Sequence, residues 1–365
     1  MALADTRFED RRRKLSTKLA ERRIDDMLVT HLTHVRYLSG FSGSNGAMLV
    51  SKDRTAAIAT DGRYTTQIAE EVPDIQAAIE RNVAVAMLSK AADGHRVGFE
   101  ADYVSVSLLE KLREACPDGV SLVPVSGVIE DIRLIKDNVE LTRLTEAAEL
   151  SVRALDELLV AGELRAGRTE REVAADLEYR MRVLGAERVS FDTIVASGPN
   201  SAKPHHGAGD RVIAERDLVT IDFGMHRLGF NSDMTRTFAI GEIGSLEHEI
   251  YEVTLAAQLA GVKAAVPGAK LADVDKACRD VIEDAGYGEY FVHSTGHGVG
   301  LDVHEAPSAA KTGEGTLAEG MTLTIEPGIY VPGKGGVRIE DTLIITDGAP
   351  KIITAATKEF TELPA

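Results

Sequence analysis

Cysteine and basic residues are scarce in this chain of 365 residues. The two cysteines, Cys116 and Cys278, stand far apart and in no metal-ligand spacing, so we expect a reducing compartment without disulfide bonds. Lys and Arg number 41 against 58 Asp and Glu, which gives a formal net charge of −17. Because contacts with phosphates require clustered basic side chains, this balance argues against a nucleic-acid partner.

Long apolar runs are also missing. No stretch of the sequence approaches the roughly 20 apolar residues that a membrane-spanning helix requires. The first 26 residues are rich in charge and contain no apolar core of a signal peptide. We therefore expect a cytoplasmic protein without a membrane partner.

Composition and length predict a globular protein with two domains of α/β (α+β) class. Apolar residues make up 44% and charged residues 27% of the chain, as in folded proteins, and the length exceeds that of one ordinary core. Residues 5–130 are predicted to form the first domain. Its apolar runs and amphipathic patterns predict strands over 27–30, 46–50, 56–60 and 96–99, and helices over 7–24, 63–71 and 105–115.

Residues 136–365 are predicted to form the second domain. Apolar residues at helical spacing predict a long helix over 141–158. Thr169 and Glu172 form a capping box that begins the next helix, which Gly185 ends in the left-handed conformation. Two more helices are expected over 246–265 and 271–285, and hairpins from strands 217–224 with 231–240 and 321–330 with 336–346. This order hints at an internal duplication, although no strong sequence repeat is found.

Five polar residues in the second domain accompany apolar strands. Asp222 and Glu326 each end an apolar run, and Glu340 follows a third. Asp233 lies eleven positions after Asp222, so an antiparallel hairpin brings these two carboxylates onto one face. His297 lies among glycines, whose missing side chains leave room for an ion or a ligand.

Four carboxylates at strand ends need a compensating charge. A buried carboxylate without a partner loses several kcal/mol of solvation, and one arginine with one histidine does not suffice for four. Two divalent cations about 3.5–4 Å apart would balance them and form a known hydrolytic arrangement. Oxygen and imidazole ligands without thiolate favour Mn, Co, Fe or Zn.

In their local sequences, these residues resemble the metal ligands of the pita-bread metallopeptidases, the family of methionine aminopeptidase, aminopeptidase P and prolidase. The matching strings, in the same order, are residues 221–224, 232–237, 296–301, 325–328 and 337–341. The resemblance implies a catalytic domain with pseudo-twofold duplication and two divalent ions, manganese first, with cobalt, zinc or iron as alternatives. The implied ligands are Asp222, Asp233, His297, Glu326 and Glu340.

The first domain is similar to the creatinase-type N-terminal domain of the proline-specific branch, which contains aminopeptidase P and prolidase. Asn45, Gly46 and residues 61–64 carry this likeness. Methionine aminopeptidases usually lack a folded N-terminal domain of this size, and creatinase lacks the metal ligands. The resemblance also implies a homodimer.

The same resemblance assigns further residues to the site. His205 and His304 are implied to hold the substrate and to stabilise the tetrahedral intermediate, and His293 to lie near the substrate. Arg338 is implied to contact the substrate and, together with Tyr330, to orient the metal ligands.

The sequence thus predicts a metallopeptidase that cleaves the Xaa-Pro bond at the N-terminus of short peptides with proline at position two. The resemblance implies attack by a hydroxide activated by a dinuclear metal centre, with Glu326 relaying the proton to the leaving nitrogen. Restriction to dipeptides, or action on longer peptides, stays open. The alternatives are a catalytically inactive binding protein on the same fold and an aminopeptidase of other specificity, such as methionine aminopeptidase. His206 also stays open as an alternative match to its neighbour His205.

Overall fold

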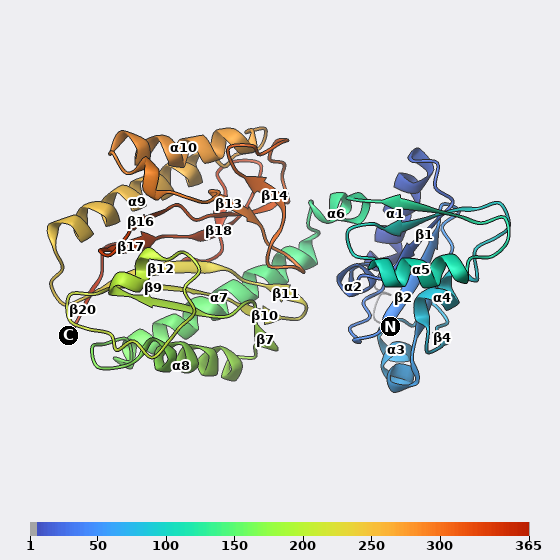
Figure 1. The fold of residues 1–365 in the computed structure, drawn as a ribbon, viewed down its shortest axis with the longest axis horizontal. Coiled ribbons are helices and arrows are strands. Elements are labelled where there is room, and N and C mark those ends of the chain that lie inside the picture. Colours follow the sequence, from blue (N-terminus) through green and yellow to red (C-terminus); the bar gives the residue numbers. More distant parts are fainter. Residues whose placement is uncertain (1–5, 365) are drawn as a thin grey trace. The chain divides into compact units, whose positions relative to one another are not determined.

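The computed structural model describes residues 6–364, and these divide into two compact units. The first unit ends at Arg133 and the second begins at Leu134. Both combine helices with strands, which confirms the predicted α/β class (Figure 1). None of the helices in the described part of the chain is both long enough and apolar enough to cross a membrane.

The first unit is built on a six-stranded mixed sheet with the order β4-β3-β2-β1-β5-β6. Its strands are β1 (Asp26–Val29), β2 (Gly46–Ser51), β3 (Ala56–Thr60), β4 (Ala78–Ile79), β5 (Arg96–Glu100) and β6 (Ser121–Val125). The four predicted strands are confirmed, and they form the central part of the sheet. The two edge strands were not predicted, because β4 has only two residues and β6 is half-exposed and contains Pro124.

Six helices accompany this sheet: α1 (Arg7–Glu21), α2 (Leu32–Ser39), α3 (Thr65–Glu71), α4 (Val83–Leu88), α5 (Val106–Glu114) and α6 (Val128–Arg133). Helices α4 and α5 place Met87 and Leu112 against the sheet residues Leu28 and Val97 in one apolar cluster. The predicted helix over 63–71 begins instead as a 3-10 turn, Gly62–Tyr64, followed by α3.

Two pairs of helices organise the second unit: α7 (Asn138–Val160) with α8 (Glu170–Val183), and α9 (Ser245–Ala264) with α10 (Leu271–Asp284). The predicted capping box of Thr169 and Glu172 begins α8, and Gly185 follows its end with a φ of 105°. Gly261 lets α9 approach α10 closely, because a Cβ atom there would lie 2.3 Å from the sulfur of Cys278. Each helix pair precedes a strand hairpin, so the predicted order of elements is confirmed.

The first hairpin pairs β9 (Leu218–Phe223) with β12 (Met234–Ile240), in a four-stranded sheet that also contains β8 (Ile194–Ser197) and β20 (Glu362–Leu363). Asp222 lies opposite Thr235 in the register, and Asp233 immediately precedes β12. The chain between them forms β10 (Met225–Arg227) and β11 (Phe230–Asn231), which pair in a separate small sheet with β7 (Arg188–Val189).

The second hairpin differs from the prediction, because it is broken into two. β15 (Thr322–Ile325) pairs with β18 (Asp341–Ile344), and β18 also pairs with β19 (Lys351–Ile352). β16 (Gly328–Val331) pairs separately with β17 (Gly335–Arg338). Pro327 has no N–H to donate to a ladder, and the interruption leaves Glu326 and Glu340 outside both strand pairs. Their N–H groups donate instead to the carbonyls of Thr295 and Thr235.

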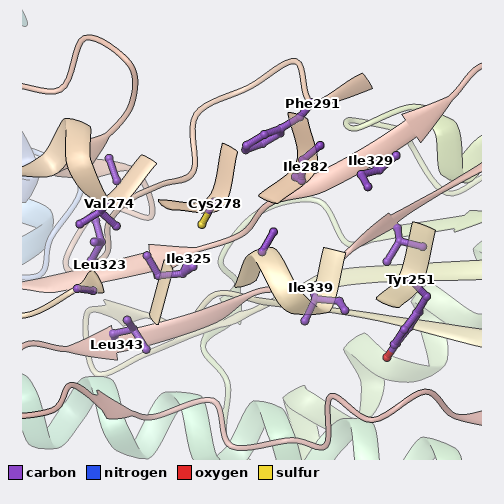
Figure 2. Close-up of a cluster of buried hydrophobic side chains, with 14 of the residues drawn as sticks. Tyr251, Val274, Cys278, Ile282, Phe291, Leu323, Ile325, Ile329, Ile339 and Leu343 are labelled. Carbon is purple, nitrogen blue, oxygen red and sulfur yellow. The ribbon is translucent and has the colours of Figure 1, made fainter. Parts of the chain in front are cut away.

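Two of the apolar clusters in the second unit include the strands of the hairpins, and a third contains Leu144, Phe230 and Val299. The first contains residues of α7 and α8 with residues of β9 and β12. The second packs Cys278 and Ile282 of α10 against Leu323 and Ile325 of β15 (Figure 2). Burial raises the pKa of the Cys278 thiol to about 12, so this cysteine acts as an apolar packing residue. The strand ends that carry polar residues are thereby held by rigid elements.

Candidate metal-dependent active site

A pocket of about 480 Å³ in the second unit gathers most of the predicted site residues. These are Asp222, Asp233, His297, Glu326, Glu340, His205, His293, His304 and Arg338. Phe191, Asp192 and Ile194, in and beside β8, also line it and were not identified from the sequence. Phe191 and Ile194 carried no signal, since an aromatic or aliphatic residue near a strand usually belongs to the core.

The five residues predicted as metal ligands converge from five separate stretches of the sequence. Ligand atoms of Asp222, Asp233 and Glu340 all lie within 4.8 Å of one another, and so do those of His297, Glu326 and Glu340. The group of Asp233, His297 and His304 meets the same criterion. Glu340 belongs to two of these groups and so connects both halves of the cluster.

His297 lies on β13 (Gly296–Gly298), which pairs with β14 (Glu305–Ala309). The expectation that glycines here leave room for an ion or a ligand is wrong for these glycines. A Cβ atom on Gly296 would lie 1.8 Å from the carbonyl oxygen of Thr324, and one on Gly298 would lie 2.2 Å from that of Ala306. The glycines therefore allow neighbouring backbones to approach β13.

Burial and mutual repulsion both raise the pKa values of the carboxylates in this pocket. Burial raises the pKa of Asp233, and the charges of Glu340, Asp222 and Glu326 raise it further. Burial likewise raises the pKa of Glu340, and it raises that of Glu326 to about 8. Arg338 opposes these shifts without cancelling them. Several negative charges at one buried place call for a cation.

The orientation of His297 fits a divalent cation. Its Nδ1 donates to the carbonyl of Gly298 (3.0 Å), which leaves the Nε2 lone pair directed at the other side. Burial lowers the pKa of His297, so the ring is neutral. Nε2 lies 3.4 Å from Glu326 Oε1 and 3.6 Å from Asp233 Oδ2. The Nε2 lone pair and the two carboxylate oxygens repel one another, and a cation bound between them would stabilise all three.

A second observation supports the same fit at Asp222. Its Oδ2 accepts a hydrogen bond from Nη2 of Arg338 (2.7 Å), while its buried Oδ1 has no hydrogen-bond partner among the described residues. Glu340 Oε2 accepts from the hydroxyl of Thr235 (2.7 Å), and Glu326 Oε1 accepts from that of Thr324 (3.3 Å). Each of these three carboxylates thus has one orienting donor and further acceptor capacity, as metal ligands generally do.

Arg338 and Tyr330 belong to one hydrogen-bonded chain. Nη1 of Arg338 donates to the hydroxyl of Tyr330 (2.9 Å), and Nε donates to the hydroxyl of Thr235 (3.1 Å). The Tyr330 hydroxyl lies 2.8 Å from Nε2 of His293, whose Nδ1 donates to the carbonyl of Ser294. Tyr330 is therefore the donor to His293. Because Nη2 of Arg338 also donates to Asp222, all three nitrogens of its guanidinium donate hydrogen bonds to protein groups.

The burial of His293 makes the stability of the protein sensitive to acid. Burial lowers the pKa of His293 to about 4, below the ordinary value of 6.5. Its contribution to stability is complete above pH 6.5 and is lost as the pH falls toward 4. Between pH 7 and 4.5 we expect metal-free wild type to lose about 2 to 3 kcal/mol more stability than His293→Gln, as measured by urea denaturation. Equal losses in the two proteins would contradict a buried neutral His293.

His205 and His304 are exposed residues that line the pocket, and their neighbours differ. The His304 ring meets the His297 ring edge to face, with the centroids 4.4 Å apart, and burial lowers the pKa of His304. His205 lies on the loop after the 3-10 turn Gly198–Ala202. The neighbouring His206 is bound through Nε2 to Glu170 (2.7 Å), so the structure separates the two adjacent histidines.

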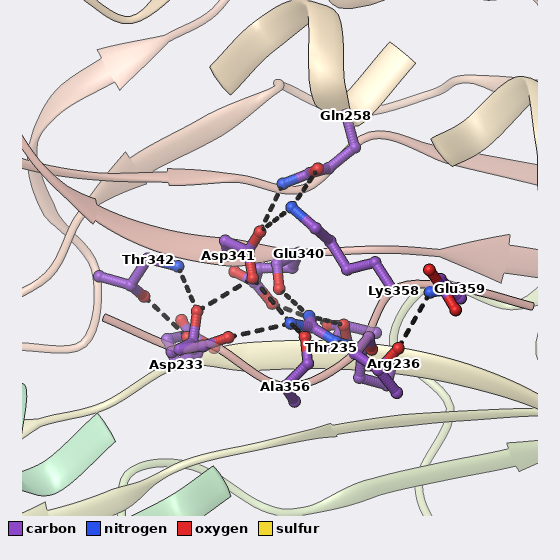
Figure 3. Close-up of polar contacts among 12 residues, drawn as sticks. Asp233, Thr235, Arg236, Gln258, Glu340, Asp341, Thr342, Ala356, Lys358 and Glu359 are labelled. Atoms are coloured by element: carbon purple, nitrogen blue, oxygen red, sulfur yellow. Dashed lines mark hydrogen bonds and ion pairs between the residues drawn. The ribbon is translucent and has the colours of Figure 1, made fainter. Parts of the chain in front are cut away.

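A buried polar network lies behind Glu340 (Figure 3). Arg236 donates to the backbone carbonyl of Glu340 and to the carboxylate of Asp341, and it also binds the carbonyls of Thr354 and Ala356. Asp341 accepts further hydrogen bonds from Gln258, Thr354 and Lys358. The network thereby ties the C-terminal segment to the strands that carry Asp233 and Glu340.

An α/β scaffold whose strand ends and loops direct carboxylates and imidazoles into one pocket defines a metal-dependent hydrolase. The family model described as Metallopeptidase family M24 matches residues 142–347, and the one described as Creatinase/Prolidase N-terminal domain matches residues 11–135. The chain belongs to metallopeptidase family M24. It is a hydrolase, and membership of this family implies the use of divalent metal.

Similar proteins cover nearly the whole chain. The Xaa-Pro dipeptidase of Pyrococcus furiosus is 37% identical over 360 residues, which are 97% of this chain and 100% of the relative. The structure of a Xaa-Pro dipeptidase from Bacillus anthracis matches 98% of this chain and 100% of its own, with 39% identity and a TM-score of 0.93. An X-Pro aminopeptidase from Thermotoga maritima matches 97% of this chain and 99% of its own, with 35% identity and a TM-score of 0.87.

Proposed function

We propose that this chain hydrolyses the Xaa-Pro bond at the N-terminus of short peptides. The observation that carries the proposal is the convergence of four carboxylates and one imidazole in a pocket of about 480 Å³. Relatives that match nearly the whole chain are named for this activity, which selects the substrate class. A pocket of this volume lies within the range that binds small ligands.

We infer that Asp222, Asp233, His297, Glu326 and Glu340 hold two divalent ions, with manganese as the first candidate. Asp233, His297 and Glu340 each belong to two of the overlapping ligand groups, so the five side chains would hold the ions as one connected set. Divalent ions bound here would supply Lewis-acid polarisation and lower the pKa of water. Cobalt, zinc and iron suit the same oxygen and nitrogen donors.

We assign the steps of catalysis to individual side chains of the pocket. Water attacks the carbonyl carbon of the Xaa-Pro bond, and Glu326 takes its proton. Glu326 then delivers this proton to the proline nitrogen as the carbon–nitrogen bond breaks. His304 and His205, which line the pocket, stabilise the oxyanion of the tetrahedral intermediate. Arg338 holds Asp222 in place throughout.

The choice between a dipeptidase and an aminopeptidase depends on how the pocket receives the end of the substrate. A dipeptidase must pair the free carboxylate of the proline with a cation or with neutral donors. Four of the five N–H donors of Arg338 bind protein groups, so His205 and His304 are the further candidate donors among the lining residues. We propose dipeptides as the preferred substrates, with the N-terminal Xaa-Pro bond of longer peptides as the second candidate.

The proposed activity is tested with metal-stripped protein that is re-supplied with each cation. We expect manganese to restore the hydrolysis of Ala-Pro, and Ala-Ala to be cleaved at least about tenfold more slowly, since loss of well-fitted groups reduces transition-state binding by about 1.4 kcal/mol or more. Comparing Ala-Pro with Ala-Pro-Gly separates the two candidate activities. Equal cleavage of Ala-Pro and Ala-Ala would contradict proline specificity.

We also propose that the chain forms a homodimer, as its resemblance to the proline-specific branch implies. Sedimentation equilibrium measures this directly, since a dimer has twice the mass of 39.2 kDa. A species of 39.2 kDa at micromolar concentration would contradict it.

A further inference from the structure

Glu170, the first residue of α8, is a fully buried carboxylate outside the five proposed ligands. Its Oε1 accepts hydrogen bonds from the N–H (2.9 Å) and the hydroxyl (2.7 Å) of Ser197 and from the side-chain amide of Asn200 (3.0 Å). Its Oε2 accepts from Nε2 of His206 (2.7 Å) and from the N–H of Gly209 (3.2 Å). All of these donors belong to one segment, residues 197–209.

This segment carries His205 at the wall of the pocket. The carbonyl of Pro204, the residue before His205, accepts from Nη1 of Arg338 (3.3 Å). His206, the residue after it, is bound to Glu170. The exposed His205 therefore lies between two anchored neighbours, one held from the Asp222 side of the site and the other from α8.

The charge of Glu170 is maintained despite its burial. Burial raises the pKa of Glu170, but hydrogen bonds from Asn200, His206 and Ser197 lower it to below its ordinary value. The N-terminus of a helix also favours a negative charge. A glutamine at this position would keep the length of the side chain but replace one acceptor oxygen by an NH₂ donor. That donor would face either His206 or Ser197.

We propose that Glu170 is a positioning residue for His205, acting through His206 and through the turn of Ser197 and Asn200. The inference rests on the role proposed above for His205. Groups that act on a reacting substrate must be held to within about 0.5 Å of the productive geometry, and an exposed loop histidine needs neighbours that supply this constraint. The buried carboxylate of Glu170 supplies it from one side of His205.

The test is a double-mutant cycle of Glu170→Gln with His205→Ala, assayed on Ala-Pro with manganese-loaded enzyme. We expect Glu170→Gln to lower kcat by about tenfold with KM changed less than about twofold, as for residues that orient others. In the His205→Ala background the same substitution should change kcat by less than about twofold, because its effect passes through His205. His206→Ala, which removes one of the hydrogen bonds to Glu170, should behave like Glu170→Gln.

A readout without turnover accompanies the cycle. In metal-free protein, Glu170→Gln should increase amide hydrogen exchange across residues 197–209 by about tenfold or more, while the rest of α8 exchanges as in wild type. The matched control is Glu178→Gln, a partly exposed carboxylate about two turns further along α8, which should leave both kcat and this exchange unchanged.

Two results would overturn the inference. The first is an equal loss of kcat from Glu170→Gln with and without His205, which would indicate a general structural role. The second is unchanged exchange across residues 197–209 in the Glu170→Gln protein. If wild type fails to hydrolyse Ala-Pro, the proposed function fails, and the exchange measurement still decides whether Glu170 anchors the segment. If His205→Ala has wild-type kcat, the roles of both residues are wrong.

Discussion

Replacing Glu326 by alanine is expected to lower the rate of Ala-Pro hydrolysis by more than about a hundredfold and to reduce the bound metal. Oε1 of Glu326 lies 3.4 Å from Nε2 of His297, and the ligand atoms of Glu326 and Glu340 lie within 4.8 Å of each other, so the substitution takes away a proposed ligand. It also takes away the proposed carrier of the proton. Metal catalysis is worth several kcal/mol, and each 1.36 kcal/mol corresponds to about a tenfold change in rate. Steady-state kinetics and elemental analysis of the dialysed protein measure both effects.

Two further variants separate loss of metal from loss of chemistry. His304→Ala should keep its metal and lose mainly kcat, since His304 is proposed to act on the substrate. Glu319→Ala removes an exposed carboxylate before the second hairpin and should match wild type in both measurements. Wild-type turnover by Glu326→Ala would exclude the role proposed for this residue, and wild-type turnover by His304→Ala would exclude the role of that histidine.

Replacing Arg236 by methionine is expected to destabilise the protein by about 3–5 kcal/mol, because it leaves Asp341 with Lys358 as its remaining cationic partner and several buried carbonyls without a donor. Both side chains are fully buried. The substitution also removes the donors to the carbonyls of Glu340 and Thr354 (Figure 3). Urea denaturation of the metal-free protein at pH 7 measures the loss. Because the network holds the backbone of Glu340, the affinity for manganese should fall as well.

The matched control is Arg153→Met, which breaks an exposed ion pair with Glu157 on the surface of α7. Such pairs contribute about 0–1 kcal/mol, so this variant should differ little from wild type. A loss below about 1 kcal/mol for Arg236→Met would show that the buried network contributes little to stability.

Much of the fold was predictable, because local patterns decide it. The apolar run of residues 218–221 predicted a strand, and the eleven-residue separation of Asp222 and Asp233 predicted that a hairpin brings them together. The capping box of Thr169 and Glu172 predicted the start of α8, which it forms. In each case the residues that carry the pattern lie close together in the sequence, within one or two turns of a helix or one pair of strands.

The features that escaped prediction depend on contacts between distant parts of the sequence. The hydroxyl of Thr235 binds Glu340, a partner 105 positions away, and no local pattern marks it. The glycines around His297 were assigned to ligand access, yet they face the backbones of Thr324 and Ala306. The second hairpin was predicted as continuous, although Pro327 within it was a local signal for the break.

Anomalous diffraction from a crystal grown with manganese tests the central proposal most directly. We expect two anomalous peaks about 3.5–4 Å apart, as in two-metal hydrolytic sites, enclosed by Asp222, Asp233, His297, Glu326 and Glu340. Peaks located elsewhere, or these five side chains out of coordinating reach of the manganese, would contradict the proposed metal centre.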